Sequence, residues 1–128
     1  MAISRLPQDR WSWVEINQGA LRRNTRAFKN LLNPRQRLCC VVKADAYGHG
    51  AVACAKIMYA TGADMFAVAT VKEGIELREG GIVSPILLLS EPPAESIDLL
   101  LEHDIMPSVY TFEFALAYGR RRAAGRRR

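Results

Sequence analysis

The sequence of 128 residues has the length of one ordinary domain. Hydrophobic residues make up 49% and charged residues 24%, a balance typical of a globular fold with a core and unlike that of a disordered chain. The net charge of +5 comes from residues 120–128, which hold six arginines, and without these arginines the net charge is −1. The composition therefore gives the body of the chain no basic character that would favour nucleic acid.

The sequence has three cysteines, Cys39, Cys40 and Cys54, an odd number in which two are adjacent. This spacing fits neither a disulfide framework nor a metal site, so we interpret them as buried, reduced thiols of a cytoplasmic protein. Residues 1–13 lack the apolar stretch of a signal peptide, and no apolar run approaches the ~18 residues of a membrane span. We expect no metal and no membrane contact.

The first elements precede the main repeat of strands and helices. Residues 11–16 alternate between apolar and polar side chains, which predicts a short strand. Asn17 can cap a helix that the pair Asn33-Pro34 ends. The face of this helix that is expected to pack carries Leu21, Phe28 and Leu32, with basic residues on its solvated side.

From residue 38 on, short apolar runs alternate with helical patterns. The predicted strands are 38–42, 64–70, 85–90 and 105–110, and the predicted helices are 50–60, 72–79, 94–103 and 111–118. Strands and helices that alternate at this spacing predict parallel βαβ units. The first strand is apolar on both faces, which suggests a sheet covered on both sides.

Two architectures suit about four such units: a small open α/β sheet, or half of a (β/α)8 barrel, whose complete form needs about 250 residues. Composition does not choose between them. Both place active residues at the carboxyl ends of the strands, where Lys43, Thr70, Ser90 and Tyr110 lie.

Lys43 is the most informative of these residues, because it ends a strand predicted to be buried. An amine taken out of water pairs with a charge, lowers its pKa, or is used in a covalent bond such as a Schiff base. The turn that follows contains Tyr47, Gly48 and Gly50.

The run Val41-Val42-Lys43-Ala44-Asp45-Ala46-Tyr47-Gly48-His49-Gly50 closely resembles the cofactor-attachment signature of alanine racemases. Further segments follow in the order and spacing of that family: Trp13-Val14-Glu15-Ile16, Phe66-Ala67-Val68-Ala69, Glu73-Gly74 and Pro85-Ile86-Leu87-Leu88. The resemblance covers about residues 11–118. It implies an α/β fold that is the N-terminal half of a (β/α)8 TIM-type barrel, with about four parallel βα units preceded by a short strand and a helix. We expect this partial domain over residues 1–119 and a basic disordered tail over 120–128.

By this resemblance, Lys43 forms the internal aldimine with pyridoxal 5′-phosphate and then acts as acid and base on one face of the substrate Cα. Tyr47 matches the tyrosine that hydrogen-bonds the cofactor phosphate, with an ordinary core or surface tyrosine as the alternative. Leu89 matches a leucine near the cofactor ring, and plain barrel core is an equal alternative. We interpret Asp45 and His49 as structural.

The resemblance further implies interconversion of L-alanine and D-alanine by a homodimer that supplies D-alanine for peptidoglycan. In that family, a tyrosine from the partner's C-terminal domain acts on the opposite face, and no position here matches it. We therefore expect this chain to be an N-terminal fragment that is inactive alone. We also expect unpaired strand edges at 38–43 and near 105–110 to make it oligomeric or poorly soluble.

Two other functions stay open. One is a non-catalytic pyridoxal phosphate-binding protein, which needs Lys43 but no second base. The other is a basic interaction module that acts through residues 120–128, for which salt-dependent nucleic-acid binding is the discriminating observation.

Overall fold

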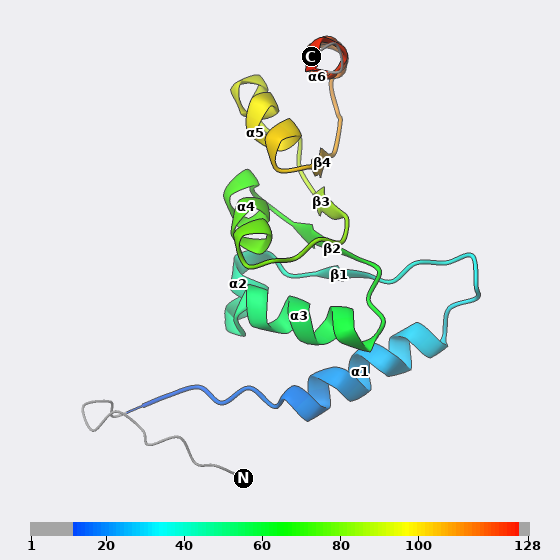
Figure 1. Cartoon of the computed structure of the whole chain (residues 1–128). Helices are drawn as coiled ribbons and strands as arrows, with labels where there is room; N and C mark the ends of the chain where they lie inside the picture. Colours follow the sequence, from blue (N-terminus) through cyan, green and yellow to red (C-terminus); the bar gives the residue numbers. More distant parts are fainter. Residues whose placement is uncertain (1–11, 126–128) are drawn as a thin grey trace.

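The computed structural model describes residues 12–125, which form one parallel four-stranded sheet with helices along it (Figure 1). The strands are β1 (Cys39–Val41), β2 (Met65–Val68), β3 (Ile86–Leu88) and β4 (Ile105–Pro107). The helices are α1 (Gln18–Asn30), α2 (Lys43–Gly48), α3 (Ala51–Thr61), α4 (Val71–Glu79), the 3-10 turn η1 (Ala94–Ser96), α5 (Ile97–Glu102) and α6 (Phe112–Gly125).

The strands lie in the order β1-β2-β3-β4, and every neighbouring pair is parallel. A doubly wound sheet reverses its strand order at a switch point, and this sheet has no such reversal. Helices α3, α4 and α5 consequently follow the sheet along one side (Figure 1). The sequence left two architectures open, a small open α/β sheet and half of a (β/α)8 barrel. The strand order favours the second, and the predicted α/β half-barrel is confirmed.

The two faces of the sheet differ sharply in burial. One face packs under the helices, and its register places Cys40, Phe66, Ile86 and Ile105 in one row, the last three of which are at most 1% exposed. The next row, Val41-Ala67-Leu87-Met106, belongs to the opposite face, where Val41 is 41% and Met106 40% exposed. The expectation of a sheet covered on both sides is therefore wrong for residues 12–125, because successive right-handed crossovers place their helices on the same side.

The predicted strand at residues 11–16 is also wrong where it is described. Residues 12–16 have no regular structure, and Trp13 and Val14 are 53% and 80% exposed. Alternation alone does not make a strand, because the backbone of a strand needs a hydrogen-bonded partner, and none lies beside these residues in the described part of the chain.

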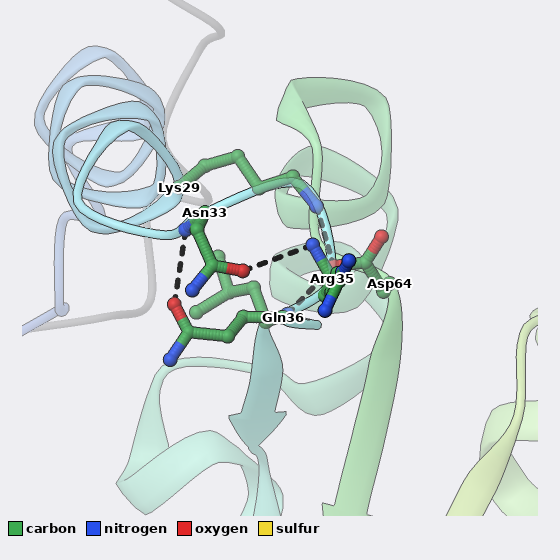
Figure 2. Close-up of polar contacts among 6 residues, drawn as sticks. Lys29, Asn33, Arg35, Gln36 and Asp64 are labelled. Carbon is green, nitrogen blue, oxygen red and sulfur yellow. Dashed lines mark hydrogen bonds and ion pairs between the residues drawn. The ribbon is translucent and has the colours of Figure 1, made fainter.

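Helix α1 begins as predicted, since the Asn17 side chain accepts a hydrogen bond from the Ala20 N–H. Its packing face agrees with the prediction at Leu21, which packs against the core, and differs at other positions. Phe28 is 63% exposed, whereas Thr25 is buried. Lys29, expected on the solvated side, is half-buried and donates to Asp64 of the loop before β2 (Figure 2).

Arg78 joins the loops at the amino ends of β3 and β4. Its guanidinium donates hydrogen bonds of 2.7–2.8 Å to four backbone carbonyls, those of Ile82, Ser84, His103 and Asp104. Five N–H donors in a rigid plane suit such a set of acceptors. The amino ends of β3 and β4 are thus held together by the Arg78 side chain.

The C-terminal residues depart from the predicted disordered tail. Helix α6 continues to Gly125, past the expected boundary at 119, and Arg121 forms an ion pair with Asp98 of α5. A carboxylate partner gives the arginine a fixed position that composition alone does not reveal. Residues 126–128 lie outside the described residues.

The cysteines are free, but only Cys54 is buried; Cys40 is half-buried and Cys39 exposed. Cys39 stands on the uncovered face of the sheet, which the burial prediction assumed to be covered. Burial raises the pKa of the Cys40 thiol to about 11, aided by the neighbouring Cys39 and Asp64. Within residues 12–125, no helix is long and apolar enough to cross a membrane, and no group of histidine, cysteine or carboxylate side chains is placed to hold a metal.

Candidate functional site

Lys43 lies just beyond the carboxyl end of β1, as the first residue of α2. The backbone has already left the extended conformation at Val42, whose ψ is 23°. The Lys43 side chain is half-exposed rather than buried, which differs from the expectation for a strand covered on both sides. Within residues 12–125, its amine has no ion pair or side-chain hydrogen bond, and it is therefore accessible to a ligand.

The segment after Lys43 has an unusual backbone. Ala44, Asp45, Ala46 and Tyr47 all have left-handed dihedral angles, with φ between 50° and 56°. Each non-glycine residue in this conformation costs roughly 1–2 kcal/mol, so four in succession need compensation from their surroundings. Left-handed backbone also reverses the chain within a few residues and so keeps Tyr47 in the same turn as Lys43.

Hydrogen bonds within the turn supply part of this compensation. The Ala46 N–H donates to the Val42 carbonyl over 2.9 Å, and the Asp45 carboxylate accepts the Ala51 N–H at the start of α3 over 2.7 Å. His49 Nδ1 lies 2.9 Å from the Ala46 carbonyl oxygen. The structural interpretations of Asp45 and His49 are thus supported by their contacts.

Two glycines, Gly48 and Gly50, end the turn. Gly48 and Gly50 have φ of 85° and 90°, a region in which a side chain is strained. Their role is to return the chain from the left-handed segment to α3, as the sequence suggested.

Glu73, in the first turn of α4, reaches across to this segment. One carboxylate oxygen accepts the Ala44 N–H over 2.8 Å, and the other accepts the N–H groups of Ala69 and Thr70 over 2.8 and 3.0 Å. The Thr70 hydroxyl in return accepts the Glu73 N–H, which completes a capping box. Burial raises the pKa of the Glu73 carboxyl, but the hydrogen bonds from these backbone donors together outweigh it, so the pKa lies below its usual value.

Tyr47 and Leu89 both have the exposure that a ligand contact requires. Tyr47 is 60% and Leu89 38% exposed. The Leu89 N–H donates to the Val68 carbonyl, so the parallel ladder continues past β3 and places Leu89 on the same face as Leu87. Lys43 and Leu89 consequently lie at the same, carboxyl end of the sheet.

Three other residues predicted at strand ends have structural partners. Thr70 caps α4, the Ser90 hydroxyl donates to the Ala69 carbonyl, and the Tyr110 hydroxyl donates to the Leu89 carbonyl. Glu91, which the sequence analysis did not single out, accepts hydrogen bonds from Tyr110 and Thr111. Glu73 was likewise missed as a site residue, although Thr70 followed three residues later by Glu73 is a recognisable capping-box pattern.

A cavity of about 400 Å³ lies between α1 and the turn, with Asn24, Val42, Tyr47, His49 and Met58 among its lining residues. Val41 and Val42 at the end of β1 both line it, together with Tyr47, whereas Lys43 does not.

Comparison with known proteins gives a consistent result. The family model described as the N-terminal domain of alanine racemase matches residues 16–128. An alanine racemase of Carboxydothermus hydrogenoformans is 45% identical over 85% of this chain, and one of Synechocystis sp. is 48% identical over 81%. The crystal structure of alanine racemase from Bacillus anthracis with bound L-Ala-P superposes with a TM-score of 0.81 at 36% identity over 85% of this chain.

These matches cover only part of the relatives. The chain spans 29% and 28% of the two sequences and 28% of the crystallised chain. What is shared is therefore the first part of the barrel, with the carboxyl-end turn that carries Lys43.

Proposed function

The chain belongs to the alanine racemase family, and from this premise we propose that it contributes the cofactor-attachment lysine, Lys43, to the interconversion of L-alanine and D-alanine. The observation that carries the proposal is the placement of Lys43. Its amine is accessible and unpaired within residues 12–125, at the carboxyl end of a parallel sheet, where barrel enzymes hold their active residues.

The side chains present suit pyridoxal 5′-phosphate. A primary amine is the group that bonds covalently to the cofactor's aldehyde, and Lys43 supplies one. Tyr47 is exposed in the same turn and offers a phenol to the phosphate, while Leu89 offers partly exposed apolar surface at the same end of the sheet. When bound, this cofactor withdraws electrons from the substrate and so makes its Cα proton removable.

Lys43 has a second role in this proposal. With the cofactor bound to the substrate, the free Lys43 amine would remove the Cα proton from one face or return it there. Inversion of the Cα also needs an acid or base on the other face. We propose that a tyrosine of a partner subunit fills this role in a homodimer, since no residue of this chain matches it.

Two broader features belong to the proposal. D-alanine made in this way would serve bacterial peptidoglycan, and the free thiols favour a reducing, cytoplasmic location. Because the chain spans under a third of its relatives, we expect it to form no D-alanine by itself.

The test is covalent trapping. The chain is mixed with equimolar pyridoxal 5′-phosphate, reduced with borohydride, digested and analysed by mass spectrometry. We expect the adduct on Lys43 and its loss in Lys43→Ala. Lys56→Ala is the matched control, because Lys56 is an exposed lysine of the neighbouring helix α3. An adduct distributed equally over the surface lysines would contradict the proposal.

A further inference from the structure

The hydrogen bond between Glu73 and Ala44 exceeds what helix capping requires. A capping box uses one carboxylate contact to the N-cap N–H, which here is the contact to Thr70. The opposite carboxylate oxygen is directed instead to the Ala44 N–H, 29 residues earlier in the chain. In the described part of the chain, this is the side-chain hydrogen bond that ties the left-handed segment to the next βα unit.

The Ala44 N–H lies in the backbone directly next to Lys43. It belongs to the peptide unit that joins Lys43 to Ala44. The orientation of this peptide unit fixes the ψ angle of Lys43 and the φ angle of Ala44, the first left-handed residue. A peptide that rotates freely here would let the Lys43 side chain change its direction. Strained backbone persists only where its surroundings determine it, and Glu73 supplies that constraint from a separate element.

We propose that Glu73 is a positioning residue that fixes the Lys43–Ala44 peptide and thereby directs the Lys43 amine towards the cofactor. This inference rests on the proposed function of Lys43. Glu73 acts through the backbone and does not itself touch the cofactor. Its charged form is the one required, because both oxygens accept hydrogen bonds at once.

Glu73→Gln isolates this role. Glutamine has the same shape but only one acceptor oxygen, so it cannot satisfy Ala44 on one side and Ala69 with Thr70 on the other. Glu76→Gln is the matched control, with the same chemical change on the same helix at an exposed position. Thr70→Ala removes the hydroxyl that caps α4 but leaves the hydrogen bond between Glu73 and the Ala44 N–H. This variant therefore distinguishes a loss of α4 stability from a loss of Lys43 positioning. Glu73→Asp, which keeps the charge but is one methylene shorter, is a second variant if Glu73→Gln does not fold.

The first readout is the rate at which Lys43 is trapped. The amine nitrogen bonds to the aldehyde carbon of pyridoxal 5′-phosphate, the carbonyl oxygen leaves as water, and borohydride then reduces the C=N bond to a secondary amine. We expect Glu73→Gln to slow this at least tenfold, while Glu76→Gln and Thr70→Ala stay within about twofold of the unaltered chain. Equal rates in all four proteins, or equal slowing by Thr70→Ala, would overturn the inference.

The second readout does not use the cofactor. Amide hydrogen exchange at Ala44 and Ala46 measures whether the segment is held. We expect at least tenfold faster exchange there in Glu73→Gln, and little change in Thr70→Ala. If the unaltered chain forms no adduct at Lys43, the proposed function fails, and unchanged exchange in Glu73→Gln would separately refute the role of Glu73.

Discussion

Asp64 holds Lys29 of α1 through a hydrogen-bonded ion pair of 2.5 Å, and the same carboxylate oxygen accepts the Leu38 N–H over 2.6 Å (Figure 2). Helix α1, the entry to β1 and the entry to β2 are therefore joined at one oxygen atom. The loop between α1 and β1 is folded by its own contacts, in which Asn33 accepts from the Arg35 N–H and donates to the Gln36 side chain (Figure 2). Asp64 thus connects α1 to the sheet through polar contacts.

This link predicts a loss of stability in acid. The hydrogen bond from Lys29, with that from Leu38, holds the pKa of the Asp64 carboxyl below its usual value of 3.8. A carboxyl whose pKa is lowered by folding stabilises the fold above its unfolded pKa, and this contribution is lost as the pH falls below 4 through the folded pKa.

We expect Asp64→Ala to lower the free energy of unfolding by about 1–3 kcal/mol at neutral pH and by less at pH 3. Urea unfolding at the two pH values measures the difference. Glu76→Gln, which removes an exposed ion pair with Lys72, is the control and should cost under about 0.5 kcal/mol. An Asp64→Ala effect that is the same at both pH values would show that the carboxylate charge is not involved.

Replacement of Arg78 by lysine should destabilise the fold. Lysine keeps the charge but presents one nitrogen, which cannot reach four carbonyls on two loops. We expect Arg78→Lys to cost about 1–3 kcal/mol of unfolding free energy, because partly buried acceptors lose their donors. Urea unfolding is the measurement, and Arg22→Lys on the exposed face of α1 should stay within about 0.5 kcal/mol. Similar stabilities of the two variants would contradict this account of Arg78.

Helices α3 and α4 approach so closely at Gly80 that a methyl group has no room. A Cβ at Gly80 would lie 2.5 Å from Cγ1 and 2.8 Å from Cγ2 of Val52. The backbone φ of Gly80 is −69°, so the cost of a side chain there is steric and not conformational. We expect Gly80→Ala to destabilise the fold by about 1–3 kcal/mol.

A double-mutant cycle checks the cause. In a Val52→Ala background, the two methyl groups are gone, and Gly80→Ala should cost under about 1 kcal/mol, which gives a coupling energy of about 1–2 kcal/mol. Thermal or urea unfolding of the four proteins measures it. Additive costs would mean that the strain arises elsewhere, for example at the Glu76 carbonyl oxygen, 3.2 Å from the same Cβ position.

The uncovered sheet face should make this chain associate with itself. Val41, Leu89 and Met106 are 38–41% exposed there, and β1 and β4 each pair on one side only within residues 12–125. Apolar surface beside unpaired strand edges favours self-association. We expect sedimentation coefficients that rise with protein concentration.

Met106→Lys should shift this equilibrium towards the monomer, because it places a charge on the uncovered face. Val83→Lys is the matched control, since Val83 is 81% exposed in the loop between α4 and β3. A monodisperse monomer of the unaltered chain at all concentrations would refute the prediction.

The sequence by itself determined the local features of this protein. The alternation of apolar runs and helical patterns predicts four parallel βα units, and Asn17 marks the start of a helix because its cap contact is local. The residues around Lys43 indicate cofactor attachment, because an amine, a phenol and glycines must lie within one short turn. All of this depends on neighbours within a few residues along the chain.

Only the tertiary structure decided the rest. The strand order favoured the barrel architecture, and one face of the sheet is uncovered in the described residues. Asp98 pairs with Arg121 of α6, in a segment for which composition predicted disorder. The left-handed backbone after Lys43 is the clearest case, because the alanine and tyrosine residues in it do not favour this conformation locally. Its support includes a carboxylate 29 residues away, and a contact at that separation forms only when β1 and β2 have paired and brought Glu73 beside Ala44.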